Sequence, residues 1–163
     1  MSDSEPQAGP PARFFEDFTE GEQILTQGRT ITETDASLWA MFTGDMNPMH
    51  VDDEYATRHG LFGGRFPPGL MVVAIASGLK ERLGLFAGTG LAMLEQTIRY
   101  HSPAIVGDTV HVTLTVERVS RQRGRCRGIV EFKYEIHKGD AKLVADGEWT
   151  MLVAARTEQG EDL

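Results

Sequence analysis

The sequence predicts an α+β fold in which a curved antiparallel sheet wraps around one long apolar helix. Four segments in the second half of the chain alternate between apolar and polar residues, as half-buried strands do. The segment before them has no polar face over Leu70–Ala76, which is typical of a helix surrounded by protein on most sides. An apolar helix that precedes an antiparallel sheet is the element that the sheet must cover.

Two elements are expected in the first third of the chain. Gln23–Thr32 carries β-branched and aliphatic residues and is interpreted as a short strand. Thr32-Glu33-Thr34-Asp35 then starts a helix, because a hydroxyl caps it and acids occupy its first turn. Apolar residues continue at helical spacing up to Gly44, a natural C-terminal stop. One further helical turn is expected at Asp53–His59.

The apolar helix is expected to start at Pro67-Pro68-Gly69, because prolines are tolerated only before or within a first helical turn. It continues to Gly84. The strands after it are Leu91–His101, Asp108–Val119, Gly128–His137 and Lys142–Ala155. The turns between them are Gly107-Asp108, Arg123-Gly124 and Gly139-Asp140, at a spacing that implies an antiparallel sheet.

One strongly curved antiparallel sheet around one buried helix is the arrangement of the hot-dog fold. The 163 residues fit a single copy of it, and no internal repeat indicates a second. Residues 1–12 are expected to form a disordered tail, residues 13–156 the domain, and residues 157–163 a C-terminal tail. Because such a sheet leaves an edge strand free, we expect a homodimer or a higher oligomer built from dimers.

Composition excludes several classes of partner. A net charge of −8 disfavours nucleic acid and anionic membrane surfaces. The single cysteine, Cys126, excludes an intramolecular disulfide and a thiolate metal cluster, and is interpreted as a packed or edge thiol of a strand. No secretory signal and no apolar run of membrane-spanning length is present, so the expected compartment is the cytoplasm.

The segment Gly44–His50 is the strongest candidate for chemistry. It places a carboxylate (Asp45), an amide (Asn47) and an imidazole (His50) around a helix-stopping Asn-Pro turn. A turn can aim Asp45 and His50 into one small volume, as general acid/base chemistry requires. The alternative is a polar surface loop in which Asp45 caps a turn and His50 is solvated.

Gly44-Asp45-Met46-Asn47-Pro48-Met49-His50-Val51-Asp52, with the later Gly63-Gly64-Arg65 and Pro68-Gly69-Leu70-Met71, resembles the MaoC-like branch of hot-dog proteins. The best understood members are (R)-specific enoyl-CoA hydratases. The resemblance implies that Asp45 and His50 form the catalytic dyad and that the Gly69 N–H receives the thioester carbonyl. It also implies supporting roles for Asn47 and Ser77. Many members have histidine where this chain has Pro68, a departure that bears on acyl-chain preference or loop closure.

The implied reaction is the reversible hydration of a trans-2-enoyl-CoA to an (R)-3-hydroxyacyl-CoA. It needs a base for the attacking water, an acid for C2 and a donor for the charge on the thioester oxygen. Pro67 and Pro68 have no N–H, so Gly69 and Leu70 supply the first free donors of the helix. No cofactor is expected, since coenzyme A is part of the substrate. No metal is expected beside His50, because no second histidine lies nearby in the sequence.

Three alternatives stay open. A thioesterase on the same fold and a non-catalytic acyl-CoA-binding subunit both compete with the hydratase. Each supporting residue also has a purely structural role available: Gly69 relieves crowding, Asn47 serves the turn and Ser77 fills a packed helix. The coenzyme phosphates have several candidate partners, none of which is singled out: Arg65, Lys80, Arg82, Arg99 and the Arg118–Arg127 cluster, which is equally consistent with a solvated hairpin tip.

Overall fold

The computed structural model describes residues 12–121, 126–139 and 141–156. The tails expected at residues 1–12 and 157–163 lie outside this part of the chain, except for Ala12. The boundaries of the domain therefore stay predictions.

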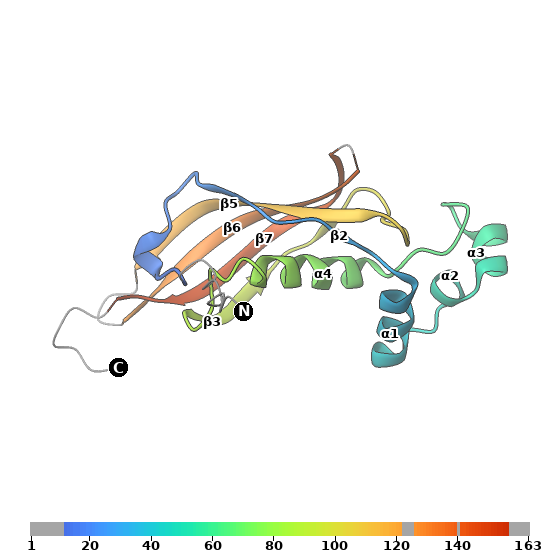
Figure 1. Cartoon of the computed structure of the whole chain (residues 1–163), viewed down its shortest axis with the longest axis horizontal. Coiled ribbons are helices and arrows are strands. Elements are labelled where there is room, and N and C mark those ends of the chain that lie inside the picture. Colours follow the sequence, from blue (N-terminus) through green and yellow to red (C-terminus); the bar gives the residue numbers. More distant parts are fainter. Residues whose placement is uncertain (1–11, 122–125, 140, 157–163) are drawn as a thin grey trace, which may run out of the picture.

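The described strands form one antiparallel sheet in the order β1-β5-β6-β7-β3, with β2 also beside β5 and β4 also beside β7. Their bounds are β1 Gln23–Leu25, β2 Arg29–Thr30, β3 Gly90–Gln96, β4 Arg99–Tyr100, β5 Thr109–Arg121, β6 Arg127–Lys138 and β7 Lys142–Ala154. The helix α4 (Gly69–Glu81) lies along one face of this sheet (Figure 1). The predicted α+β hot-dog arrangement is confirmed.

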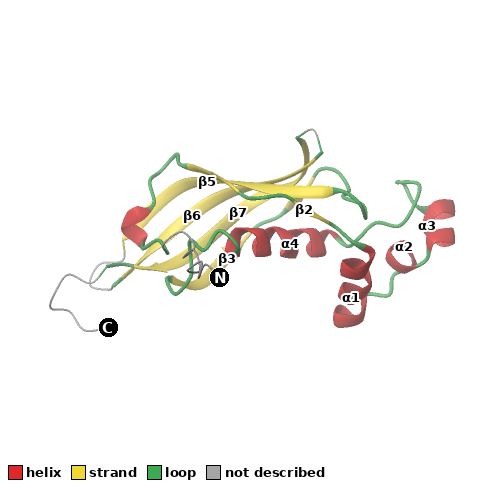
Figure 2. Ribbon diagram, viewed as in Figure 1, coloured by secondary structure: helices red, strands yellow, loops and turns green. Residues whose placement is uncertain are grey.

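The other helices lie at one end of the molecule. They are α1 (Glu33–Thr43), α2 (Pro48–Val51) and α3 (Asp53–His59), and the short 3-10 helix η1 (Phe15–Asp17) lies at the opposite end. Figure 2 shows α1, α2 and α3 extending beyond the sheet, with α1 directed away from it. We call residues 33–68, which contain these three helices, the helical excursion.

The core lies between α4 and the sheet. Val112, Leu114, Phe132 and Tyr134 alternate inward along β5 and β6 and are fully buried. The buried side of α4 packs against them through seven side chains: Met71, Val72, Val73, Ile75, Ala76, Leu79 and Lys80. The prediction that α4 is covered on most sides is correct except for one stripe, because Leu70, Ala74 and Gly78 are exposed.

Two predicted strands are each divided by a threonine. Gln23–Thr32 separates into β1 and β2 because the Thr26 hydroxyl accepts the N–H of Val112 at 2.9 Å, which takes the place of a backbone acceptor. Leu91–His101 separates into β3 and β4 at Thr97, whose carbonyl oxygen accepts the Tyr134 hydroxyl at 2.9 Å. Side-chain bonds to the backbone compete here with the regular ladder.

The strand order differs from a simple series of hairpins. β5, β6 and β7 are consecutive neighbours, but β3 lies beside β7 at the far edge of the sheet. The Gly107-Asp108 turn therefore joins β4 to β5, which are not paired with each other. The Arg123-Gly124 turn lies outside the described residues, as does Asp140 of the last turn. Alternation identifies strands but does not indicate which strands pair.

Helix α1 begins and ends where the sequence predicts. Thr32 caps it, since the Thr32 hydroxyl accepts the Asp35 N–H at 3.2 Å and the Asp35 carboxylate accepts the Thr32 N–H at 2.9 Å. Arg29 also contacts this carboxylate. Burial raises the pKa of Asp35, but the hydrogen bonds from Thr32 and the charge of Arg29 more than offset this and lower it overall. Gly44 ends the helix in the left-handed conformation, with φ of 73°.

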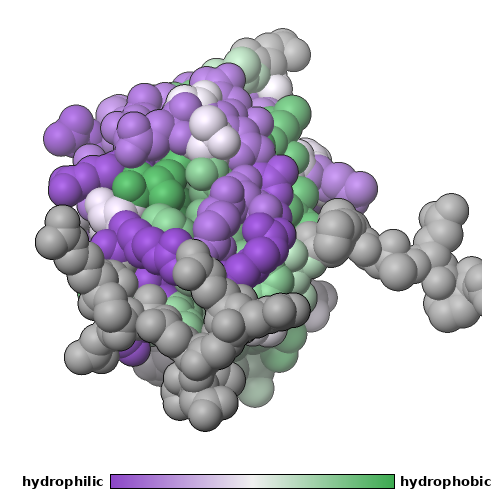
Figure 3. Space-filling model, turned by 90° about the vertical axis from the view of Figure 1, so that its left-hand side faces the viewer, coloured by the Kyte–Doolittle hydropathy of each residue, from purple (hydrophilic) through white to green (hydrophobic). Residues whose placement is uncertain are grey.

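Surface polarity differs between the two ends of the molecule. Phe42 and Leu61 of the helical excursion are 88% and 92% exposed. The opposite end presents mostly hydrophilic side chains around smaller hydrophobic areas (Figure 3). Among the described helices, none combines the length and the apolar character that crossing a membrane requires.

Thr32→Ala should destabilise the protein by about 1 kcal/mol, because the Asp35 N–H loses its acceptor at the start of α1. Urea unfolding at neutral pH measures the loss. Thr34→Ala, at the exposed second residue of the same helix, is the matched control and should change stability by less than about 0.5 kcal/mol. Equal stability of the two variants would contradict the capping role.

Candidate active site

The motif Gly44–His50 forms a series of interlocking turns rather than a regular element. After Gly44 ends α1, the Thr43 hydroxyl accepts the Asp45 N–H at 3.2 Å and itself donates to the Trp39 carbonyl at 2.7 Å. The chain is thereby directed back towards α1, and Asp45 is held at its C-terminal end.

Asn47 shapes the second half of the motif. Its side-chain oxygen accepts the Met49 N–H at 3.1 Å and caps α2, which Pro48 begins. The Asn47 N–H donates to Oδ1 of Asp45 at 3.3 Å. These bonds occupy one Asp45 oxygen, so that Oδ2 faces His50. Asn47 does not line the cavity described below, and its observed contacts serve the turn.

His50 is held by its neighbour Phe66. Its Nδ1 lies 2.7 Å from the Phe66 carbonyl oxygen, and the two rings meet edge to face at 5.1 Å between centroids. Because a carbonyl oxygen only accepts, Nδ1 carries the hydrogen in this contact. In neutral His50, Nε2 therefore keeps its lone pair.

Nε2 of His50 lies 3.9 Å from Oδ2 of Asp45. This separation is too long for a direct hydrogen bond and suits one bridging water. The His50 side chain is 12% exposed and that of Asp45 is 42% exposed. The imidazole is thus fixed and the carboxylate is open to solvent.

The loop that carries Phe66 is tied to α1 and α3 by Arg65. This guanidinium binds Asp53 of α3 and Glu33 of α1, each at 2.8 Å. The hydrogen bond to Asp53, followed by that to Glu33, raises the pKa of Arg65. Both hydrogen bonds join a charged donor to a charged acceptor, so Arg65 links the two helices on either side of the motif.

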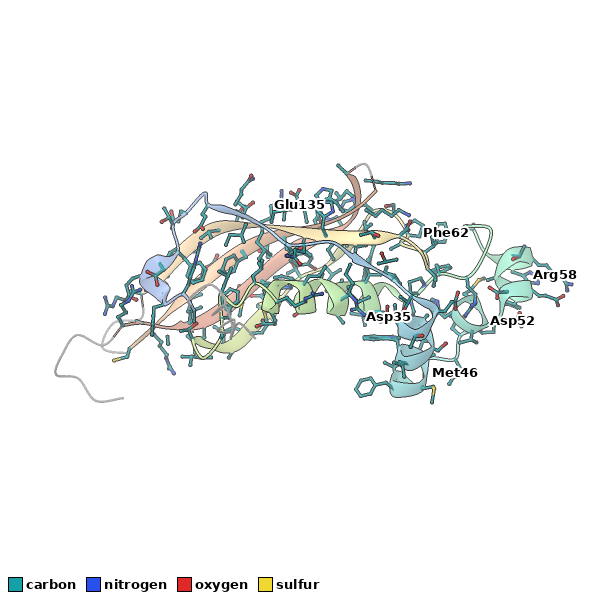
Figure 4. All side chains as sticks on the ribbon, viewed as in Figure 1. Asp35, Met46, Asp52, Arg58, Phe62 and Glu135 are labelled. Carbon is teal, nitrogen blue, oxygen red and sulfur yellow. The ribbon has the colours of Figure 1, made fainter. Side chains whose placement is uncertain are left out.

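Asp45 and His50 border a cavity of about 690 Å³ between the helical excursion, α4 and the sheet. Aromatic side chains form much of its wall, namely Trp39, Phe62, Phe66 and Tyr100. The rest of the lining comprises Thr43, Pro67, Pro68, Gly69, Leu70, Val72, His101, Ser102, Pro103, Ala104 and Val144. Figure 4 shows Phe62 on the loop between α3 and α4. An apolar cavity with a few polar groups is typical of a small-molecule site.

Gly69 is the first residue of α4 and lies in this wall, next to the capping residue Pro68. The described chain provides no acceptor for the Gly69 N–H. A Cβ atom at Gly69 would lie 2.5 Å from Cε1 of Tyr100, so the ring excludes any larger residue. The structural role predicted as an alternative for Gly69, relief of crowding, is therefore present, and its N–H is available as well.

Ser77 lies away from the cavity. It is eight residues, or about 12 Å along the helix, beyond Gly69. It borders a separate depression against β3, together with Lys80 and Met93. Within the described chain Ser77 does not line the cavity that Asp45 borders, and its predicted support of Asp45 stays a prediction.

Several predicted phosphate partners are already engaged. Arg65 is bound to two carboxylates, and Lys80 is 2% exposed beside Glu81 at 2.7 Å. Arg118 lies 3.8 Å from Glu131, and part of the cluster that it begins is outside the described residues. In residues 12–121, 126–139 and 141–156, no group of three or more histidine, cysteine or acidic side chains is gathered as a metal site would need.

The aromatic residues of the cavity were not identified from the sequence. Tyr100 belongs to β4, and Trp39 and Phe66 come from the helical excursion. In the sequence, only Gly69 at the helix start indicated that another residue approaches closely, and it did not indicate which residue. Their convergence depends on the pairing of β4 with β7, which no local pattern encodes.

Comparison with known proteins identifies relatives of this chain. The chain is 33% identical over 144 residues to an (R)-specific enoyl-CoA hydratase of Rhodospirillum rubrum, covering 88% of this chain and 93% of that protein. It is 31% identical over 146 residues to a 3-hydroxybutyryl-CoA dehydratase of Methylorubrum extorquens, covering 89% and 87%.

Solved structures of similar proteins superpose on most of this chain. A MaoC-like dehydratase from Rhodospirillum rubrum superposes with a TM-score of 0.80 at 25% identity, covering 90% of this chain and 100% of that one. An (R)-hydratase from Pseudomonas aeruginosa gives 0.72 at 27% identity, covering 92% and 93%. Residues 16–138 match the family described as "MaoC like domain". The chain therefore belongs to the MaoC-like family.

Proposed function

We propose that the protein catalyses the reversible hydration of a trans-2-enoyl-CoA to an (R)-3-hydroxyacyl-CoA. One observation carries the proposal: the 3.9 Å gap between His50 and Asp45 borders the cavity whose wall includes Gly69, and the N–H of Gly69 has no partner among the described residues. The two relatives are named as a hydratase and a dehydratase, which are hydro-lyases, and the chain is an enzyme of that class. The (R) configuration comes from the name of the first relative.

A water between His50 and Asp45 would donate one hydrogen to Nε2 and the other to Oδ2, leaving a lone pair for C3 of the substrate. As the C3–O bond forms, the water proton passes to the dyad and the π electrons move towards the thioester. The dyad then returns a proton to C2. Because both new bonds involve the same face, the addition is syn.

The negative charge of the enolate would develop on the thioester oxygen. The Gly69 N–H can receive it at the positive end of the α4 dipole, and this donor is fixed before the substrate arrives. The aromatic wall of the cavity would exclude water from the acyl chain. These steps need no cofactor beyond the coenzyme A of the substrate.

We also propose that the protein is a homodimer. Strand β3 is an edge strand whose seven residues are all exposed, including the apolar Leu91, Met93 and Leu94. An exposed apolar edge favours pairing with a second chain, and the two-fold antiparallel pairing of β3 with its copy would continue the sheet. Placement in the cytoplasm stays a prediction.

Asp45→Asn and His50→Ala should each lower kcat by about 10²- to 10⁴-fold, because each removes a group that can take up a proton from the water. The assay follows the loss of enoyl-thioester absorbance with a panel of trans-2-enoyl-CoA substrates. Asp52→Asn is the matched control, since Asp52 caps α3 and an asparagine caps equally well.

Wild-type activity in either dyad variant would contradict the mechanism. Release of free thiol from a saturated acyl-CoA, without hydration, would instead favour the thioesterase. Binding of an acyl-CoA without either reaction would favour a non-catalytic subunit.

Gly69→Ala should lower kcat/KM by about tenfold or more, because the new methyl group and the Tyr100 ring cannot occupy their present positions together. Gly78→Ala, on the same helix, is the control, since its methyl group would meet no atom within 4 Å. Both variants are assayed as above and checked for folding by thermal unfolding. Equal activity of Gly69→Ala and wild type would show that the close approach of Gly69 to the Tyr100 ring is not needed for catalysis.

Leu94→Asp should convert the dimer to a monomer, because it places a charge on the paired edge. Light scattering coupled to size-exclusion chromatography measures the mass. The control is Leu25→Asp on β1, the edge strand at the other side of the sheet, which should remain dimeric. A monomeric wild-type protein would overturn the proposal.

A further inference from the structure

Tyr100 has an unusual position beside the start of α4. Its hydroxyl end, not only the body of its ring, approaches Gly69: a Cβ built there would lie 2.7 Å from Cζ and 3.1 Å from the hydroxyl oxygen. The side chain also lines the cavity of the dyad. The phenol therefore lies next to the helix terminus at which the thioester oxygen is proposed to bind.

The position of Tyr100 is set by the sheet. Its backbone pairs with Ala145 of β7, and the next residue, His101, donates its N–H to the Val144 carbonyl at 2.8 Å. Ser102 adds a hydrogen bond from its hydroxyl to the Leu143 carbonyl at 2.6 Å. Three successive residues are thus attached to β7, so the ring is carried by a rigid part of the fold.

The Tyr100 hydroxyl is free to bind a ligand. No residue in the described chain hydrogen-bonds to it, and Tyr100 is 50% exposed and lines the cavity. Burial raises the pKa of Tyr100, so the hydroxyl keeps its hydrogen over the neutral range. A phenol of this kind is a donor.

Two donors without a partner in the described chain, the Gly69 N–H and the Tyr100 O–H, therefore belong to neighbouring residues of the same cavity wall. An enolate oxygen has lone pairs for both, and paired donors are the usual arrangement at a developing oxyanion. We propose that Tyr100 is a catalytic residue whose hydroxyl donates a second hydrogen bond to the thioester oxygen. This rests on the proposed hydratase function and adds a residue to its site.

The alternative is that Tyr100 only forms the wall of the cavity. Tyr100→Phe distinguishes the two roles, because it keeps the ring and removes the donor. If the hydroxyl stabilises the enolate, kcat should fall by about tenfold to a hundredfold while KM changes by less than about threefold. Tyr55→Phe is the control, since Tyr55 contacts the His59 ring within α3 and does not line the cavity.

A second measurement does not depend on turnover. Butyryl-CoA labelled with ¹³C at the thioester carbonyl cannot be hydrated, and its bound carbonyl stretch is read by infrared difference spectroscopy. Hydrogen bonding lowers this frequency, so Tyr100→Phe should move it part of the way back to the value in water-free solvent. In Tyr100→Phe the carbonyl oxygen would keep only the hydrogen bond from the Gly69 N–H.

The outcomes separate the two proposals. A wild-type protein that hydrates enoyl-CoA, with Tyr100→Phe equal to it in kcat and in carbonyl frequency, overturns the role of Tyr100 and leaves the hydratase intact. A wild-type protein that binds butyryl-CoA without hydrating any enoyl-CoA fails as a hydratase, and the frequency still tests the hydrogen bond. A protein that binds no acyl-CoA overturns both.

Discussion

The burial of α4 against the curved sheet is the interaction on which the rest of the structure depends. Seven α4 side chains are removed from water, and each large one contributes about 1.5–3 kcal/mol. Across the core, Tyr134 and Trp149 stack with their ring centroids 4.3 Å apart. Because the body of α4 cannot shift in this packing, its first residue, Gly69, is held in the wall of the cavity.

The opposite wall of the cavity is held in a different way. In the helical excursion, Ala40 and Ala56 are buried, while Phe42 and Leu61 are almost fully exposed. Its shape depends on helix caps and on Arg65, which joins two of its helices. The wall of the cavity formed by α4 and the sheet is therefore held by hydrophobic packing, and the wall formed by the helical excursion is held by polar contacts. Asp45 and His50 belong to the second wall.

Local features of this protein could be predicted from the sequence, and long-range ones could not. The Thr32 cap, the Gly44 stop and the start of α4 depend on residues close together in the sequence. The types of these residues favour the conformations that begin and end a helix. The breaks at Thr26 and Thr97 depend on bonds to strands far along the chain. For the same reason the motif indicated Asp45 and His50, whereas Tyr100 emerged only from the pairing of β4 with β7. Ser77 was assigned by resemblance, and its place along α4 separates it from the cavity.

Under the proposed reaction, the two walls would perform different chemistry. The carbonyl would bind to donors of the wall formed by α4 and the sheet, where preorganisation matters most because the charge on the oxygen changes during the reaction. Water would bind between two groups of the wall formed by the helical excursion, where a gap of 3.9 Å leaves room for a molecule that must enter and react. The hydrogen-bond donors to the carbonyl need a rigid support, whereas the water site needs room for a molecule to enter and leave. A fold that draws its two walls from separate supports can meet both, because adjusting one wall does not disturb the packing of the other.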